Sequence, residues 1–122
     1  MNKSKKTLVL GASPNPARYS RLAVERLVAH NHPVIAIGKR TGNIDDVRID
    51  TGKLMHAGVD TITLYLNPGN QKEYYEYIFS LKPERIIFNP GTENKELAQM
   101  AADKGIQTIE ACTLVMLSTG MY

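Results

Sequence analysis

Residues 7–29 read TLVLGASPNPARYSRLAVERLVA, and this stretch decides the fold. The pattern predicts an apolar strand from Thr7 to Leu10, a turn rich in Gly, Ser and Pro at 11–16, and an amphipathic helix from Ala17 to Ala29. In α/β proteins such an opening places a helix N-terminus and free backbone N–H groups where a phosphate can bind. The stretch therefore predicts an anion site at the first turn.

Individual residues of the turn support that prediction. Gly11 can adopt backbone angles barred to other residues and lets a ligand come close, and the Ser13 hydroxyl can donate to a phosphate oxygen. Asn15 followed by Pro16 is typical of a helix start. Arg18 lies one turn later. A cation at a helix N-terminus opposes the helix dipole, so the position of Arg18 is better explained by an anion beside it. The alternative is an ordinary strand-to-helix connection, because the stretch lacks the full G-x-G-x-x-G pattern.

Length and composition limit the possible classes of protein. A chain of 122 residues is long enough for one core, so we expect a single domain, 1–122. A net charge of +3 permits a small anionic ligand, and no basic run with interleaved aromatics indicates nucleic acid binding. The single cysteine favours a reducing compartment, and the apolar run before Gly11 is too short for a membrane span. We therefore expect a cytoplasmic protein.

Strands and helices alternate along the rest of the chain. Further strands are predicted at 34–38, 61–66, 85–88 and 106–110, and helices at 70–81, 94–104 and 112–119. Asn70 and Glu73 have the form of a capping box for the helix at 70–81. This alternation predicts an α/β fold of three layers, with a mainly parallel five-stranded sheet covered on both faces.

Residues 41–60 fit this alternation least well. Ile44, Val47 and Ile49 indicate short extended pieces rather than a long crossover helix. Residues 53–57 are predicted to form one helical turn that ends at Gly58.

The second strand ends in Gly38-Lys39-Arg40. Ligands of parallel sheets bind outside the carboxyl ends of the strands, and NAD-binding folds usually hold an acid at this place for the ribose hydroxyls. Two cations there would attract a ribose phosphate instead. The alternative is a solvated turn.

Two later strands both end in Asn-Pro-Gly, at residues 67–69 and 89–91. Each proline stiffens the exit from its strand, and each glycine permits a turn and close approach to a ligand. Because the carboxyl ends of parallel strands share one edge of a sheet, we expect both loops beside the first turn.

The sequence indicates no catalytic constellation. His30 and His32 flank the predicted end of the first helix, and His56 lies in the connector. No spacing typical of Ser-His-Asp triads, paired carboxylates or metal ligands is present. Cys112 could be activated at the start of the last helix, and the alternative is a small buried residue.

With these loops assembled, the chain resembles the stand-alone CoA-binding domain proteins. These are relatives of the N-terminal domain of the succinyl-CoA synthetase α subunit and of NDP-forming acyl-CoA synthetases. The resemblance covers nearly the whole chain and is carried by Gly11-Ala12-Ser13-Pro14-Asn15-Pro16 with Arg18-Tyr19-Ser20, by Ala36-Ile37-Gly38-Lys39, by Asn89-Pro90-Gly91 and by Glu110-Ala111-Cys112. It implies a Rossmann-like fold whose first turn cradles the CoA diphosphate. The phosphohistidine of the synthetases lies in a separate domain that has no equivalent here.

The resemblance also implies ligand contacts. Lys39, with Arg40, matches the base that meets the phosphate on the adenosine ribose, and the loop at 66–68 matches the one near the adenine. Many members have Asn-Pro after the second strand and a Gln-containing loop after the fourth, and this chain departs from both patterns. The expected ligand-binding residues are Gly11, Ala12, Ser13, Asn15, Arg18, Tyr19, Ser20, Gly38, Lys39, Arg40, Leu66, Asn67, Pro68, Asn89, Pro90 and Gly91, with no metal ligand.

We therefore expect a module that binds CoA or an acyl-CoA without catalysis of its own, and no nucleic acid or membrane partner. One alternative is an NADP-dependent oxidoreductase, because Lys39 and Arg40 would equally suit a 2′-phosphate. Against it, the chain has no substrate domain and no evident proton donor. The other alternative is an interaction module without a ligand, forming a homodimer through a face that includes Tyr65, Tyr74, Tyr75 and Tyr77.

Overall fold

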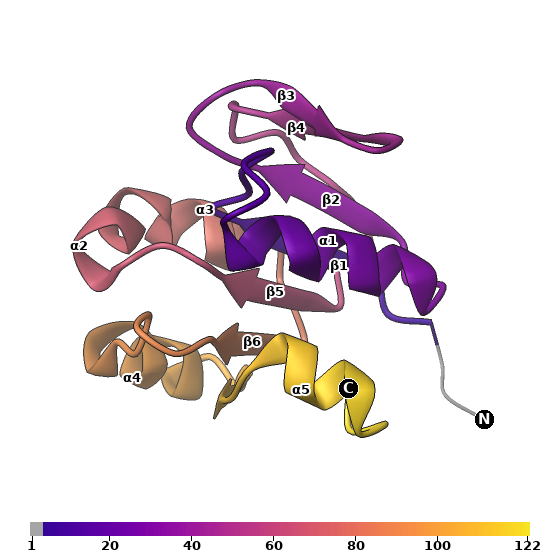
Figure 1. Ribbon diagram of the computed structural model, residues 1–122. Coiled ribbons are helices and arrows are strands. Elements are labelled where there is room, and N and C mark those ends of the chain that lie inside the picture. The colour runs from indigo at the N-terminus through magenta and orange to yellow at the C-terminus, as the bar shows by residue number, and fades with distance from the viewer. Residues whose placement is uncertain (1–3) are drawn as a thin grey trace.

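The computed structural model describes residues 4–122, in which seven strands form one sheet with helices on both faces (Figure 1). The strands are β1 (Thr7–Leu10), β2 (Val34–Ile37), β3 (Gly42–Ile44), β4 (Val47–Asp50), β5 (Thr61–Leu64), β6 (Arg85–Phe88) and β7 (Gln107–Glu110). Their order is β3-β4-β2-β1-β5-β6-β7, and every neighbouring pair is parallel except β3 with β4. The predicted Rossmann-like α/β fold is confirmed, with seven strands in place of five.

The five predicted strands are β1, β2, β5, β6 and β7. All residues of β1, β5 and β6 are buried, as expected for parallel strands covered on both faces. β1 lies between β2 and β5, so the winding of the chain changes direction beside β1. In open α/β sheets, ligands bind at such a switch point.

Helices α1 (Tyr19–Ala29) and α5 (Thr113–Ser118) cover one face of the sheet and lie toward the viewer in Figure 1. The other face carries α3 (Tyr75–Ser80) and α4 (Lys95–Asp103), and α3 follows the short α2 (Pro68–Gln71) and the 3₁₀ helix η1 (Lys72–Tyr74). Leu27 of α1 packs with Val9 of β1 on the first side. Ile78 of α3 and Leu97 of α4 pack with Leu8 on the second. The sheet therefore separates two hydrophobic layers.

The two additional strands come from the segment where short extended pieces were predicted. β3 and β4 form an antiparallel hairpin, and β4 pairs in parallel with β2. Ile44 and Ile49 are completely buried and join the layer under α1. Asp45, in the hairpin turn, has a φ of 50°, a backbone region that Asp tolerates better than most residues.

The helical turn expected at 53–57 is wrong, because these residues have no regular structure. Their main chain lies against α3, where the Tyr77 hydroxyl donates to the Leu54 carbonyl oxygen at 2.5 Å. Lys53 Nζ donates to the Glu73 carbonyl oxygen at 2.7 Å. Both contacts join residues about twenty positions apart, so a local pattern does not predict them.

The first helix begins later than predicted. Asn15 does not cap it, because the Asn15 Oδ1 accepts from the Ala17 N–H at 2.9 Å and closes a small turn of its own. The helix starts at Tyr19, and Arg18 occupies the N-cap position without a side-chain cap. At the other end, Asn31 has a φ of 65°, which confirms the predicted left-handed stop.

The helix predicted at 70–81 begins earlier, and the capping box of Asn70 and Glu73 is wrong. Asn67 is the cap of α2, with its Oδ1 accepting from the Asn70 N–H at 2.9 Å. Pro68 then occupies the first helical position, where its missing N–H costs nothing. The sequence Asn67-Pro68 is therefore the stronger start signal.

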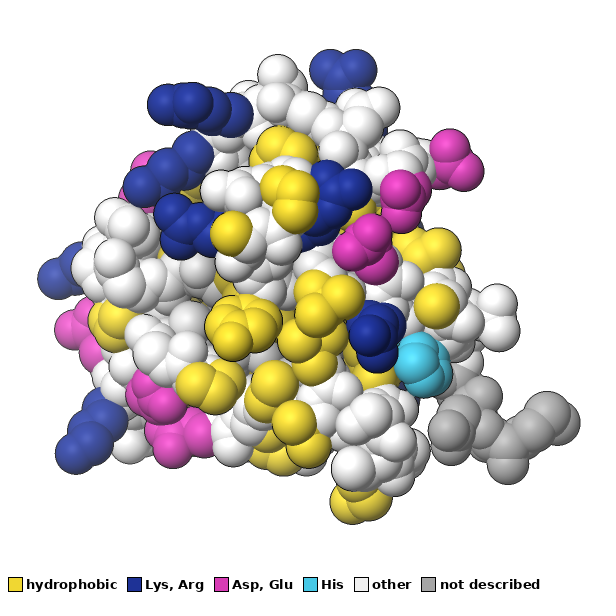
Figure 2. All heavy atoms as spheres, in the orientation of Figure 1, with side chains coloured by type: hydrophobic (Ala, Val, Ile, Leu, Met, Phe, Trp, Pro, Cys, Tyr) yellow, Lys and Arg dark blue, Asp and Glu magenta, His cyan; other side chains and the backbone are white. Residues whose placement is uncertain are grey.

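Tyr65, Tyr74, Tyr75 and Tyr77 do not form one exposed group, because Tyr77 is buried and Tyr65 is partly buried beside the α1 layer. Exposed large hydrophobic side chains include Val28 of α1 and Val115 of α5, and hydrophobic side chains gather on this face in Figure 2. A homodimer stays a prediction. Among residues 4–122, no helix is long and apolar enough to span a membrane.

Gly11 has a φ of +96°, and a Cβ at this position would lie 3.0 Å from Leu66 Cδ2 and 3.0 Å from the carbonyl carbon of Tyr65. We expect Gly11→Ala to lower the free energy of unfolding by about 2 kcal/mol or more, through backbone strain and collision together. Urea denaturation measures this. Gly58→Ala is the matched control, because Gly58 has a φ of +72° with nothing within 4 Å. Equal losses in both variants would contradict the collision.

His32 lies at the amino end of β2, where its Nδ1 accepts from the Lys5 N–H at 2.9 Å and its ring packs on Tyr122. Burial, followed by the charges of His30, Lys5 and Arg85, lowers the pKa of His32, and Asp60 opposes this shift. A lowered pKa in the folded state means that the unfolded chain binds the proton more readily.

The contribution of His32 to stability is therefore complete above its ordinary pKa of about 6.5, and is lost as the pH falls below it. We expect the unfolding midpoint of the wild type to fall more steeply between pH 7 and pH 5 than that of His32→Asn. Asn keeps a hydrogen-bond acceptor but does not titrate. Parallel pH profiles of the two proteins would contradict this role.

Candidate functional site

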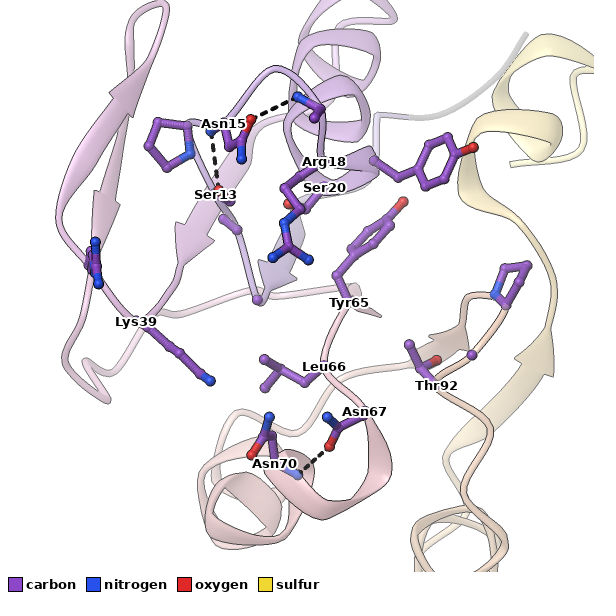
Figure 3. Close-up of a pocket in the computed structure, with 18 residues that line it drawn as sticks. Ser13, Asn15, Arg18, Ser20, Lys39, Tyr65, Leu66, Asn67, Asn70 and Thr92 are labelled. Atoms are coloured by element: carbon purple, nitrogen blue, oxygen red, sulfur yellow. Dashed lines mark hydrogen bonds between the residues drawn. The ribbon is translucent and has the colours of Figure 1, made fainter.

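A cleft of about 960 Å³ lies at the carboxyl ends of the central strands. It is lined by the loops that follow β1, β2, β5 and β6, and by the start of α1 (Figure 3). These are the loops that the parallel topology predicts to share one edge. The volume lies within the range of about 300–1,000 Å³ that is usual for small-molecule and cofactor sites.

Most of the residues predicted from the sequence line this cleft. They are Gly11, Ala12, Ser13, Asn15, Arg18, Tyr19, Ser20, Lys39, Arg40, Leu66, Asn67, Pro90 and Gly91. Gly38, Pro68 and Asn89 do not line it. Pro14, Ala17, Tyr65, Asn70 and Thr92 line it in addition.

The N–H groups directly after β1 are already paired. Gly11 N and Ala12 N donate to the Ile37 carbonyl oxygen at 2.8 and 2.9 Å. The Ser13 hydroxyl accepts from the Asn15 N–H at 3.1 Å. A phosphate at the first turn would therefore not be held by the N–H groups of Gly11 and Ala12. The hydrogen bonds among residues 4–122 leave the Ser13 N–H without an acceptor.

The start of α1 has more unpaired backbone donors than the turn before it. The N–H groups of Tyr19 and Ser20 have no acceptor among the described residues, and the first turn holds no acidic side chain. Ser20 lines the cleft, and its hydroxyl takes part in none of the side-chain hydrogen bonds found among the described residues. An uncapped helix N-terminus with a free hydroxyl favours a bound anion.

Cations surround the cleft without carboxylates. Arg18, Lys39 and Arg40 line it, and no Asp or Glu of residues 4–122 does. The ion pairs of the described residues are Arg21–Glu25 and Arg48–Asp50, so none of the three cleft cations is paired. In Figure 3 the Arg18 guanidinium and the Lys39 chain project toward the same space, from the N-cap of α1 and from the loop after β2. The cleft therefore favours an anionic ligand with charge at two separate positions.

Tyr65 forms part of the wall between these cations and the loop after β6, and the sequence did not single it out as a ligand-site residue. Its hydroxyl is buried without a hydrogen-bond partner among the described residues. Burial raises the pKa of Tyr65 well above its usual value, against smaller opposing effects of the nearby Thr113 and Thr63 hydroxyls. The phenol therefore stays neutral at physiological pH, and this wall adds no negative charge.

Gly38 and Asn89 do not line the cleft but hold the segments around it in place. A Cβ at Gly38 would lie 2.1 Å from the Ala12 carbonyl oxygen, so only glycine lets the first turn pack on the end of β2. Asn89 is buried, and its side chain donates to the Leu64 carbonyl oxygen at 2.9 Å and accepts from the Thr113 N–H at 2.9 Å. Asn89 therefore fixes strand ends instead of facing the cleft.

The remaining chemistry-bearing residues lie elsewhere. Cys112 is half-buried at the N-cap of α5 and does not line the cleft. His30 Nδ1 lies 2.8 Å from the Arg26 carbonyl oxygen, which confirms its predicted helix-end role. Among residues 4–122, no group of three His, Cys, Asp or Glu side chains could hold a metal ion.

Comparison with solved structures shows how widely this architecture occurs. An uncharacterized protein of known crystal structure is 50% identical, with a TM-score of 0.97 over 99% of this chain and 100% of that chain. A hypothetical protein from Pyrococcus horikoshii OT3 is 19% identical, with a TM-score of 0.87 over 96% and 84% of the two chains. The Thermus thermophilus structure titled cell-free ID.343 is 16% identical, with a TM-score of 0.85 over 98% and 91%. The last two likenesses concern the fold alone.

No curated protein gives a significant match to this chain. The family model described as "CoA binding domain", however, matches residues 5–118, which is nearly the whole chain and includes every residue that lines the cleft. Together with the Rossmann-like sheet, this match confirms the predicted family. The chain belongs to the CoA binding domain family.

Proposed function

We propose that this protein binds CoA or an acyl-CoA along the cleft at the carboxyl ends of β1, β2, β5 and β6. The observation that carries the proposal is the set of unpaired cations in a cleft without carboxylates, beside an uncapped helix N-terminus. CoA carries its anionic groups as a diphosphate and a separate ribose phosphate. The family to which the protein belongs supports a CoA-binding role in general.

In this proposal each part of CoA has its own position. The diphosphate binds at the start of α1, to the free N–H groups there, the Ser20 hydroxyl and Arg18. The ribose phosphate binds near Lys39 and Arg40. The adenine lies near Leu66, which is buried and gives an apolar surface beside the Gly11 turn. The proposed diphosphate site therefore lies closer to the start of α1 than the Gly11 turn expected from the sequence.

We further propose that the domain binds its ligand without chemistry of its own, in the cytoplasm. Arg18, Lys39, Arg40 and the neutral Tyr65 are the titratable groups that line the cleft with Tyr19. A general base needs a pKa near the working pH and a place beside the reacting atom. None of these residue types ordinarily has such a pKa.

An NADP-dependent oxidoreductase would use the same cations for its 2′-phosphate. Thermal shift with CoA, dephospho-CoA, acetyl-CoA, NADPH, NADH and ATP separates the candidates, because a ligand that binds only the folded state raises the unfolding temperature. We expect CoA or acetyl-CoA to give the largest shift. A larger shift with NADPH would overturn the proposal.

Lys39→Ala should weaken CoA binding while leaving dephospho-CoA almost unchanged, because only CoA carries the ribose phosphate. A hydrogen bond to a charged group is worth about 1.5–3 kcal/mol, and about 1.4 kcal/mol is a tenfold change in affinity. Wild-type protein should therefore bind CoA roughly ten to a hundred times more tightly than dephospho-CoA, and added salt should narrow the difference. Titration calorimetry on the four combinations measures this. Equal losses for both ligands would place Lys39 on the diphosphate instead.

Arg18→Gln should lower the affinity for CoA and for dephospho-CoA by the same factor, roughly tenfold or more, because both ligands carry the diphosphate. Arg26→Gln is the matched control, since Arg26 is exposed in the last turn of the same helix. It should bind both ligands as the wild type does. A loss confined to CoA in Arg18→Gln would assign Arg18 to the ribose phosphate.

A further inference from the structure

Gln71, in α2, does not line the cleft, yet its side chain holds two of the loops that form it. The residue is completely buried. Its Nε2 donates to the carbonyl oxygens of Leu66 and Thr92, both at 2.8 Å. Leu66 follows β5 and Thr92 follows β6, and both line the cleft. One amide group therefore bridges two neighbouring walls, seen in Figure 3 at Leu66 and Thr92.

The orientation of this amide is fixed by Asn94. Asn94 Oδ1 accepts from the Leu97 N–H at 3.1 Å and so caps α4. Its Nδ2 must then point away from the helix, and it donates to Gln71 Oε1 at 2.9 Å and to the Tyr75 hydroxyl at 2.8 Å. With its oxygen held by Asn94, Gln71 has only its nitrogen for the two carbonyl groups.

Thr92 is held from its other side by Asn89. The Thr92 N–H and hydroxyl both donate to the Asn89 carbonyl oxygen, at 2.9 and 2.7 Å. Asn89 is itself bonded to the end of β5 through the Leu64 carbonyl oxygen. The loop after β6 is therefore fixed to the sheet by Asn89, and Gln71 fixes it to the loop after β5.

We propose that Gln71 is a positioning residue that sets the separation of the Leu66 and Thr92 walls, and so prepares the cleft for its ligand. The inference rests on the proposed function, because CoA is the ligand that the prepared cleft would take. A site whose loops are already ordered loses less conformational entropy on binding. Gln71 has no contact with the ligand in this arrangement and acts only through the two loops.

Asn94→Asp tests the proposal without changing Gln71. Asp keeps the oxygen that caps α4 but replaces the donor to Gln71 with a second carboxylate oxygen. Gln71 then turns its nitrogen toward Asp, and its oxygen faces two carbonyl groups that it cannot bind. We expect CoA to bind about tenfold more weakly at a temperature where the variant is fully folded. We also expect the Thr92 N–H of the ligand-free protein to exchange with solvent about tenfold faster.

Two controls separate positioning from general stability. Tyr75→Phe removes only the second hydrogen bond of the Asn94 amide and should change neither measurement. Ile86→Val removes one methylene from a completely buried residue of β6 and leaves the hydrogen bonds of Gln71 and Asn94 in place. This variant should have a lower unfolding temperature and an unchanged affinity for CoA. Asn94→Ser, which also caps α4 without donating to Gln71, repeats the test if Asn94→Asp does not fold.

The outcomes are distinct for the two proposals. Unchanged CoA affinity and unchanged Thr92 exchange in a folded Asn94 variant would overturn the role of Gln71, as would an equal loss of affinity in Ile86→Val. Faster Thr92 exchange in the Asn94 variant supports that role even if the wild type binds no CoA. In that case the proposed ligand alone would be wrong.

Discussion

The edge of the sheet that holds the cleft depends on one carbonyl group, that of Ile37 at the end of β2. Its oxygen accepts from both N–H groups that follow β1, those of Gly11 and Ala12. This ties the first turn to the neighbouring strand, and Gly38 lets the two strand ends meet because a Cβ there would collide with Ala12. The close approach brings Lys39 into the same cleft as Arg18. Because Gly11 and Ala12 are paired in this way, the N–H groups without an acceptor among the described residues of this region are those of Ser13, Tyr19 and Ser20.

The sequence predicts the parallel strands well because burial on both faces demands continuous apolar residues. The hairpin of β3 and β4 is harder to predict, because each strand is very short and Ile44 and Ile49 are its only completely buried residues. The predicted helix caps at Asn15 and Asn70 were wrong for a related reason. The short side chain of Asn can accept from a main-chain N–H two or three residues later, both in a turn and at a helix start. The presence of Asn therefore does not decide which of the two structures forms.

The edge of the sheet that holds the site follows from topology, whereas the role of each residue there does not. The two Asn-Pro-Gly loops are identical in sequence, yet Asn67 is exposed and caps α2, and Asn89 is buried and joins β5 to α5. Gln71 binds a carbonyl group twenty-one positions away. Such contacts arise only when loops from different strands meet, and no periodicity in the chain encodes them.

In the proposed complex, the unpaired cations would couple ligand binding to the stability of the fold. Arg18, Lys39 and Arg40 share a cleft without a carboxylate, and like charges in one cleft repel each other. The proposed polyanionic ligand would offset that repulsion. Any ligand that binds only the folded state stabilises it by about 2.7 kcal/mol at a hundredfold excess over its dissociation constant. Lys39 directly follows the close contact at Gly38, and Arg18 occupies the N-cap position of α1. In the proposed complex, the phosphate groups of the ligand would lie between these two supports.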